Sequence, residues 1–164
     1  MKCELIKIVE LSGNKASIYS VIMNEDEISL FDMFVDENFD SHLSEIENII
    51  QRLKTIGTKT GAREHFFKLN EGSPGDGVCA LFDDPEKKLR LYCVRYGTAT
   101  VILGSGGHKS KNIRALQESE KLTQENFLMR KISERITEKI KNKEIRFSTH
   151  TNDFEGELFF EIES

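Results

Sequence analysis

The sequence has no long apolar run and no recognisable leader, and these absences exclude whole classes of protein. Its longest apolar runs are about half a dozen residues, too short to cross a membrane. The N-terminal segment MKCELIKIVEL carries acidic residues within its apolar stretch and lacks a small-residue cleavage site. No signal peptide is predicted, and we expect a cytoplasmic protein.

Cysteine is also scarce, and its placement argues against two kinds of site. Cys3, Cys79 and Cys93 lie far apart, each in an apolar, strand-like stretch. Metal sites favour close cysteine pairs, and an odd number of cysteines does not suggest a disulfide framework. We expect buried, reduced thiols that act as small hydrophobic side chains, with no metal and no cofactor.

Acidic residues are missing from one part of an otherwise acidic chain. The 164 residues, enough for a single domain, carry a net charge of −5. The stretch 87–114 nevertheless holds seven basic residues and no acid, whereas the first fifty residues hold eleven acids and three lysines. The basic stretch either binds a polyanion or pairs with acidic residues of the same chain.

The first half of the chain predicts a hairpin followed by a helix. Two β-prone runs, 3–11 and 15–23, are separated by Ser-Gly-Asn, which is typical of a short turn. The run 27–35 fits either a third strand or the approach to a helix. Residues 41–56 carry an apolar stripe at helical spacing, with Asp40 or Ser41 as the expected cap and Gly57 as the stop.

The second half predicts an antiparallel meander and further helices. Three strand-like runs, VCALF, LRLYCVRY and ATVILG, are joined by short turn sequences. We expect a loop of glycines and lysines next, a short helix at 113–118 and a long amphipathic helix at 124–142. The ending FEGELFFEIE predicts a terminal edge strand with Phe159 on its polar side, where it would mark a contact surface.

The stretch VILGSGGHKSK, residues 101–111, is reminiscent of a phosphate-binding loop. A P-loop needs G-x-x-x-x-G-K-[ST], but His108 precedes Lys109 and Leu103 lies five residues before His108. The dinucleotide pattern G-x-G-x-x-G fits at Gly104 and Gly106 and then meets Lys109. An antiparallel meander also lacks the βαβ unit that such loops require. We therefore predict no nucleotide loop.

The same stretch suits a simpler use of positive charge. A strand end that carries His108, Lys109 and Lys111 beside a strand with Arg90 and Arg95 would concentrate cations, which bind phosphate through charge-assisted hydrogen bonds. Strand alternation places Arg90, Tyr92 and Val94 on one face, and Leu91, Cys93 and Arg95 on the other. The alternative is an ordinary solvated face.

The segment 67–111 resembles the RelE/ParE superfamily of toxins, in particular its HigB-like, phage-derived branch. The resemblance rests on KL, a glycine-rich turn, VCALF, LRLYCVRY, TVILG and the basic cluster HKSK, with amphipathic helices before and after. It implies an α+β fold with a small antiparallel sheet flanked by helices. In a single domain, 1–37 would be an N-terminal β-hairpin extension, 38–145 the RelE-like core and 146–164 a C-terminal strand.

The resemblance implies the toxin of a type II toxin–antitoxin pair that cleaves ribosome-bound mRNA without a metal. In that reaction the 2′-hydroxyl attacks the adjacent phosphate, and the protein must take a proton, stabilise the phosphate oxygens and protonate the leaving oxygen. Arg90 matches the phosphate-stabilising arginine of the family, and Lys109, with His108 or Lys111, matches its basic residue after the last strand. The predicted catalytic residues are Arg90, His108 and Lys109, and the predicted RNA-binding residues are Lys88, Tyr92, Arg95, Tyr96, Lys111 and Arg114.

Such a toxin is neutralised by an acidic or helical antitoxin, here expected to be of the helix-turn-helix type. A second hypothesis is a non-catalytic binding module on the same fold. It is favoured by the acidic N-terminal segment and the pI near 5.5, since ribosome-directed nucleases are usually basic. A third hypothesis is a homo-oligomeric scaffold built on the 124–142 helix.

Overall fold

The computed structural model describes residues 1–84, 86–109 and 115–163. In the last of these segments, side chains are described from residue 120 onward. Three α-helices and a mixed seven-stranded sheet make an α+β fold, with a separate small hairpin near the C-terminus. The strands of the large sheet follow the order β3-β4-β5-β6-β2-β1-β9. The helices are α1 (Leu30–Asn38), α2 (Leu43–Thr55) and α3 (Ala115–Lys141). The strands of the large sheet are β1 (Lys2–Lys7), β2 (Ser17–Met23), β3 (Phe67–Lys68), β4 (Val78–Leu81), β5 (Leu89–Tyr96), β6 (Thr100–His108) and β9 (Phe159–Glu161).

The predicted N-terminal hairpin is present and is built into the sheet. β1 and β2 pair antiparallel, but they are shorter than predicted and residues 8–16 connect them. β2 also pairs with β6, and this pairing is parallel. The expectation of a wholly antiparallel sheet is therefore wrong, because the chain crosses from β2 to the far strands through α1 and α2 before it returns at β6.

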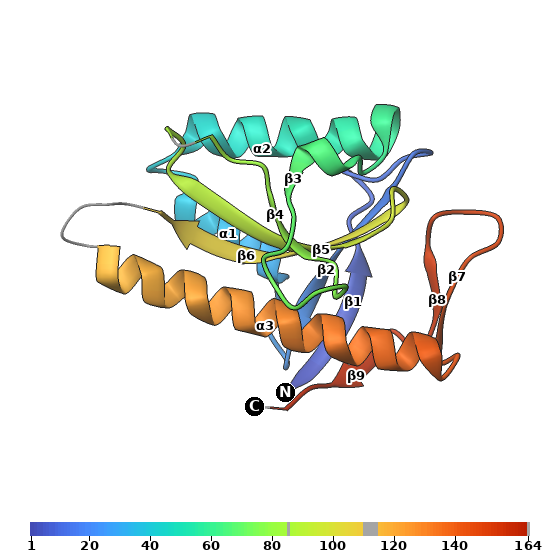
Figure 1. The fold of residues 1–164 in the computed structure, drawn as a ribbon. Coiled ribbons are helices and arrows are strands. Elements are labelled where there is room, and N and C mark those ends of the chain that lie inside the picture. Colours follow the sequence, from blue (N-terminus) through green and yellow to red (C-terminus); the bar gives the residue numbers. More distant parts are fainter. Residues whose placement is uncertain (85, 110–114, 164) are drawn as a thin grey trace.

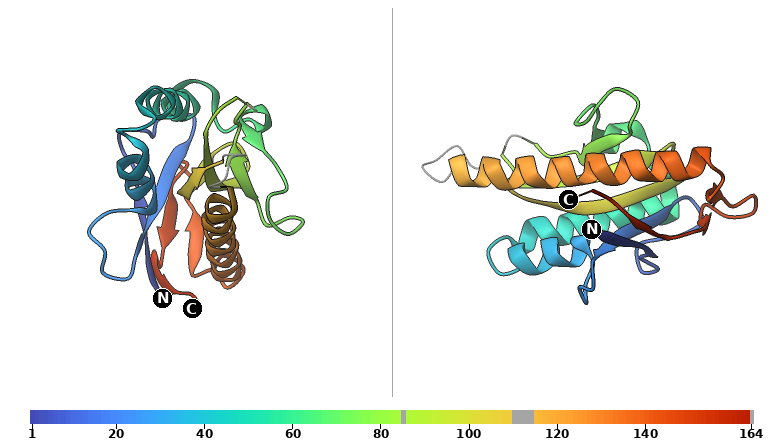
Figure 2. Two further views of the ribbon diagram at one scale, coloured as in Figure 1. Left: turned by 90° about the vertical axis from the view of Figure 1, so that its left-hand side faces the viewer. Right: turned by 90° about the horizontal axis from the view of Figure 1, so that it is seen from below.

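Helices cover both faces of the sheet, as Figure 2 shows for α1 and α2 on one side and α3 on the other. Two separate apolar cores result. The first lies under α1 and α2, where Phe34 and Ile46 are fully buried against strand residues such as Leu103. The second lies under α3, where Met129 and Ile132 pack on Ile102. Alternate residues of one strand thus serve opposite cores, as the pleat requires.

The first helical region differs from its prediction in detail. The run 27–35 contributes to helix α1, whose N-cap Ser29 accepts a hydrogen bond from the backbone of Asp32. α2 begins after His42, not after Asp40 or Ser41. The chain then continues through a π-helical turn (Ile56–Thr60) to Gly61, which adopts φ +76°. Gly57 is therefore not the stop, and the left-handed conformation is adopted four residues later.

The predicted meander β4-β5-β6 is confirmed, although β6 is longer than expected. The glycines of VILGSGGH lie within this strand, so the predicted glycine and lysine loop is wrong up to His108. Residues 110–114 lie outside the described residues. From Ala115 onward a single helix α3 replaces the two expected helices.

The predicted C-terminal strand, FEGELFFEIE, is divided into two strands, β8 (Phe154–Gly156) and β9. β7 (Ile145–Phe147) and β8 form the small hairpin, and β9 pairs with β1 at the edge of the large sheet (Figure 1). Phe159 is 72% exposed, as its place on the polar side predicted. The three cysteines are buried and free, which confirms the prediction of buried, reduced thiols, and burial raises the pKa of Cys3 to about 11. No helix of the described chain is both long and apolar enough to span a membrane.

Candidate functional site

Four charged side chains meet where β4 ends and β5 begins. The strand β6 ends at the same end of the sheet (Figure 1). Asp83 is the second residue after β4, and its Oδ1 lies 2.9 Å from Nζ of Lys68. Its Oδ2 lies 3.5 Å from Nη2 of Arg90 and also contacts Nζ of Lys109. These four residues are called the Asp83 cluster below. The predicted pair Arg90 and Lys109 therefore does converge, on a carboxylate of the same chain.

Within the Asp83 cluster the anion is the most deeply buried member. The Asp83 side chain is 5% exposed, against 15% for Lys109, 23% for Arg90 and 32% for Lys68. Three cations and one anion leave a charge of +2. Because the carboxylate lies deeper than the cations, the surplus positive charge is carried by the groups nearer to solvent.

The backbone around Asp83 is held on both sides. The amide of Phe82 donates to the carbonyl of Phe66 at 2.7 Å, and Nη1 of Arg52 donates to the carbonyl of Phe82 at 2.6 Å. On the other side, Nζ of Lys109 donates to the carbonyl of Asp84 at 2.9 Å. Burial lowers the pKa of Arg52, against the attraction of Asp83, Asp84 and Glu45. Asp83 is thus a fixed counter-ion of this site.

Arg90 also interacts with the hydroxyl of Tyr92, which lies on the same face of the sheet. Burial alone would lower the pKa of Arg90, but attraction to Asp83 and a hydrogen bond with Tyr92 outweigh it, so the pKa is raised. Burial raises the pKa of Tyr92, although hydrogen bonds with Arg90 and Asn126 of α3 oppose this. Arg90 is therefore a permanent cation and Tyr92 a neutral hydroxyl at physiological pH.

His108 lies on the opposite face from Arg90. It is the cross-strand partner of Leu89, and directly opposed residues of an antiparallel pair point to the same side. Leu89 belongs to the core under α1 and α2. The imidazole of His108 accordingly packs on His42 at the start of α2, with ring centroids 5.1 Å apart. The structure does not bring the three predicted catalytic residues together. Successive side chains of a pleated strand point to opposite faces, so His108 lies on one face of the sheet and Arg90 and Lys109 lie on the other.

The predicted RNA-binding residues are also dispersed. Lys88 is exposed next to the cluster, and its backbone amide donates to Oε1 of Glu45 at 2.8 Å. Arg95 lies at the far end of β5, where Nε donates to the carbonyl of Ala62 at 2.7 Å. Tyr92 is only 4% exposed. Lys111 and Arg114 lie outside the described residues.

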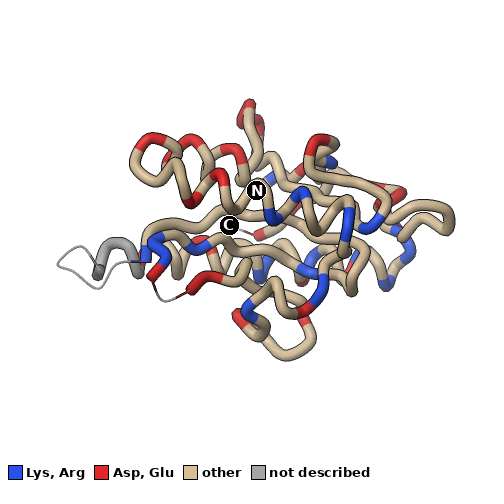
Figure 3. Tube along the Cα trace, turned by 90° about the horizontal axis from the view of Figure 1, so that it is seen from above, with Lys and Arg blue, Asp and Glu red and all other residues tan. Residues whose placement is uncertain are grey.

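Tyr96 is partly buried and packs against aromatic side chains of the C-terminal hairpin. Its ring meets Phe154 edge-on at 5.6 Å and Phe147 at 5.9 Å. Burial raises the pKa of its hydroxyl. Figure 3 shows Lys and Arg (blue) interspersed with Asp and Glu (red) along the folded trace. The acid-free stretch 87–114 therefore does not supply one continuous basic face from its described residues.

The glycines near the cluster serve packing between elements. A Cβ added to Gly104 would lie 2.4 Å from Sδ of Met129, so this glycine lets α3 approach the sheet. A Cβ added to Gly106 would lie 1.8 Å from the carbonyl oxygen of Arg90 on the next strand. The register between β5 and β6 shifts beside these residues, which is a β-bulge. The glycines thus accommodate a helix and a strand of the protein itself, and no ligand is needed to explain them.

Two members of the Asp83 cluster, Lys68 and Asp83, were missed at the level of sequence. Lys68 belongs to a strand of two residues, too short to show the alternation that reveals a strand. Asp83 lies in DDPEKK, one of the short turn sequences that join the predicted strands. The available signal was its position as the first acid after a buried strand, next to a strand that carries Arg90.

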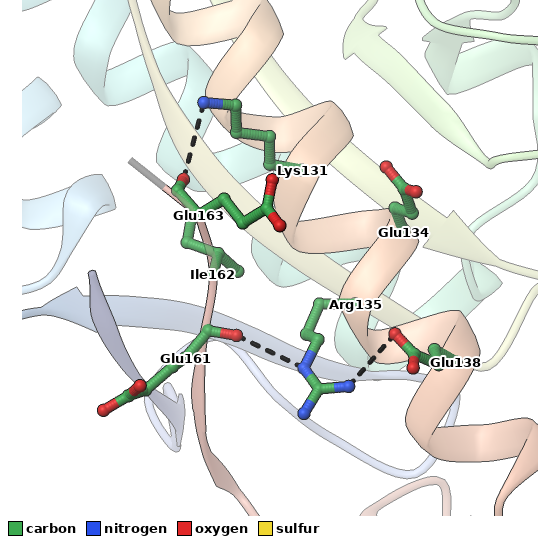
Figure 4. Close-up of a pocket in the computed structure, with 7 residues that line it drawn as sticks. All are labelled: Lys131, Glu134, Arg135, Glu138, Glu161, Ile162 and Glu163. Carbon is green, nitrogen blue, oxygen red and sulfur yellow. Dashed lines mark hydrogen bonds and ion pairs between the residues drawn. The ribbon is translucent and has the colours of Figure 1, made fainter.

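A hollow that is remote in sequence from the Asp83 cluster lies between α3 and the edge strand β9 (Figure 4). Nε of Arg135 donates to the carbonyl of Glu161 at 3.2 Å, and Nζ of Lys131 donates to that of Glu163 at 3.5 Å. Helix side chains thus cover outward carbonyls of an edge strand, which protects it from pairing with another chain. Within the described residues no group of three or more His, Cys, Asp or Glu side chains could hold a metal ion.

Comparison of the chain with models of protein families, with curated sequences and with solved structures gives no match.

Proposed function

We propose that the chain is the toxin-like component of a type II toxin–antitoxin pair and that it binds the RNA backbone at the Asp83 cluster. The observation that carries the proposal is the convergence of Arg90 and Lys109 on one oxygen, Asp83 Oδ2. Two cationic heads that share one carboxylate oxygen are close enough to contact two oxygens of one phosphate. Arg90 would stabilise the phosphate oxygens, and Lys109 would neutralise or protonate the leaving oxygen.

The order of elements supports a RelE-like fold for this proposal. Helices α1 and α2 precede the β4-β5-β6 meander, and α3 follows it, in the order that the resemblance implies. In this proposal the target is ribosome-bound mRNA in the cytoplasm, and a helix-turn-helix antitoxin is the neutralising partner.

One observation favours a second candidate, a non-catalytic binding protein of the same fold. His108 lies on the other face of the sheet from Arg90 and Lys109, and its ring packs at a tilt against that of His42. Cleavage needs a group that takes the proton of the 2′-hydroxyl. His108, the imidazole predicted for this site, is separated from Arg90 and Lys109, and this separation favours RNA binding without cleavage.

Expression of the chain in cells that lack its genomic neighbour tests both candidates. Wild type is compared with Arg90→Ala and Lys109→Ala, and with Lys15→Ala, which removes one exposed positive charge outside the cluster. We expect growth arrest with cleaved mRNA for wild type and Lys15→Ala, and a loss of roughly a hundredfold or more in cleavage for the two cluster variants, the scale seen when one transition-state donor is removed. Protein levels are matched by immunoblot.

The outcomes separate the two candidates. Growth arrest with intact mRNA that still depends on Arg90 and Lys109 would support the non-catalytic binder. Normal growth with wild type at a matched protein level would contradict the toxin. Recovery of growth when the neighbouring gene is expressed as well would support the antitoxin partner.

A further inference from the structure

The Asp83 cluster contains an anion that a phosphate-binding site would be expected to exclude. A carboxylate competes with phosphate for the same cations, so Asp83 either blocks the site or organises it. The two roles differ in geometry. A blocking anion lies between its cations and solvent, whereas an organising anion lies behind them.

Burial decides between the two roles. The Asp83 side chain is 5% exposed, and each cation that it contacts is more exposed, up to 32% for Lys68. The carboxylate therefore holds the cations from their inner side. A phosphate that approaches from solvent meets Lys109, Arg90 and Lys68 before it meets Asp83.

The chain around Asp83 also resists displacement. Phe82 is tied to Phe66 and Arg52 through both of its backbone polar groups, at 2.7 and 2.6 Å. The carbonyl of Asp84 accepts a hydrogen bond from Lys109 itself at 2.9 Å. These bonds hold the backbone on both sides of Asp83 in place, so the residue itself stays beside the three cations.

Three positive side chains that converge without an anion would repel one another and spread. The attraction of one shared carboxylate offsets this repulsion, most strongly where water is excluded. Lys68, Arg90 and Lys109 come from three separate strands or strand ends, so no single backbone element fixes their heads together. Asp83 contacts all three.

We propose that Asp83 is the positioning residue of the RNA phosphate site, which holds Lys68, Arg90 and Lys109 in place for the phosphate of the ligand. This inference rests on the proposed function, since it names how that site is held. The inference gives a negative charge a supporting role in a site that binds a polyanion. Removal of this charge should therefore weaken RNA binding, whereas simple electrostatics would predict tighter binding.

The test is the affinity of the full chain for a short single-stranded RNA labelled with fluorescein, measured by anisotropy over a series of salt concentrations. Asp83→Asn removes the charge and keeps the shape, which on electrostatics alone would tighten binding. We expect binding about tenfold weaker, equivalent to the loss of one charge-assisted contact. The slope of log K against log salt should become shallower by about one.

Three further variants show whether Asp83 acts through its cations. Asp84→Asn makes the same change of charge one residue away and is expected to leave affinity unchanged or slightly tighter. Asp83→Glu keeps the charge and moves the carboxylate by one methylene, so a weaker affinity there reports position and not net charge. The double variant Asp83→Asn/Lys109→Ala should bind no more weakly than Lys109→Ala alone, because the two changes disable one unit.

Two results would overturn the inference. Equal or tighter RNA binding by Asp83→Asn would show that Asp83 blocks or ignores the site, and absent RNA binding by the wild-type chain would remove the phosphate site itself. If Asp83→Asn does not fold, as judged by circular dichroism, Asp83→Glu decides by the same criterion. Failure of the proposed function is recognised separately, as normal growth in the cellular experiment above.

Discussion

At the scale of single residues, the charges of this protein are arranged mainly by ion pairs within the chain. Lys139 is 4% exposed and bonds to Glu144 and Glu157 at 2.7 and 2.9 Å. Asp153 bonds to Lys7 at 2.9 Å and accepts a hydrogen bond from the buried hydroxyl of Ser17. These pairs fix the C-terminal region onto the rest of the fold, and the Asp83 cluster differs from them because cations outnumber the anion.

Asp153 gives a prediction about pH. Burial acts to raise its pKa, but hydrogen bonds from Ser17 and Lys7 outweigh burial, so the folded-state pKa lies below its ordinary value. The resulting stability is present above the unfolded-state pKa and is lost as the pH falls through the folded-state pKa. We expect Asp153→Asn to lower the free energy of unfolding by about 1 kcal/mol at neutral pH.

Urea unfolding of wild type and Asp153→Asn over a range of pH measures this difference. The gap between the two proteins should narrow as the pH falls into the acid range. A gap that stays constant with pH would mean that the charge of Asp153 has no part in it.

At the scale of elements, strand β6 shows what its glycines are for. Gly106 and Gly107 are neighbours in one motif, yet their surroundings differ. A Cβ on Gly106 would lie 1.8 Å from a backbone carbonyl of β5, whereas a Cβ on Gly107 would lie 3.5 Å from the flexible side chain of Lys121. Backbone cannot move aside as a side chain can.

These surroundings predict different costs for the same substitution. Gly106→Ala should lower the free energy of unfolding by about 3 kcal/mol or more, because β5 and β6 must separate at Arg90. Gly107→Ala should change it by about 0.5 kcal/mol or less. Chemical denaturation of the two variants provides the measurement, and similar costs for both would contradict the assignment of Gly106 to a close strand contact.

The elements also show how far sequence reasoning reaches. The apolar stripe of α2 and the alternation of β5 were sufficient to predict a helix and to place Arg90 and Tyr92 on one face. The end of β6 was predicted wrongly because glycines are the usual residues of turns, and here they remain in the strand to admit Met129 and the backbone of Arg90. Local composition does not reveal which helix will pack on a strand.

At the scale of the whole molecule, the position of the site follows from the order of strands. The parallel contact of β2 with β6 places the N-terminal hairpin inside the sheet and closes the core beneath α1 and α2. The sequences of β2 and β6 do not indicate this pairing, because it depends on where α1 and α2 pack. The same long-range packing brings Lys68 and Asp83 to Arg90, so the sequence could indicate the cations of β5 and β6 but not their shared carboxylate.

The net charge of −5 would act against binding of RNA at long range, so the proposed recognition of RNA depends on a local excess of positive charge. The Asp83 cluster supplies such an excess, with three cations around one buried anion. The hollow between α3 and β9 does not, because four glutamates line it beside Lys131 and Arg135. The proposed RNA site therefore lies at the Asp83 cluster and not in this hollow.

A nuclear magnetic resonance titration of the isotope-labelled chain with single-stranded RNA tests that location most directly. The resonances of Nε–H of Arg90 and of the side-chain ammonium groups of Lys68 and Lys109 are compared with those of Lys131 and Arg135. We predict RNA-dependent shifts at Arg90, Lys68 and Lys109, with little change at Lys131 and Arg135. Shifts confined to Lys131 and Arg135, or spread evenly over all basic side chains, would contradict a phosphate site at the Asp83 cluster.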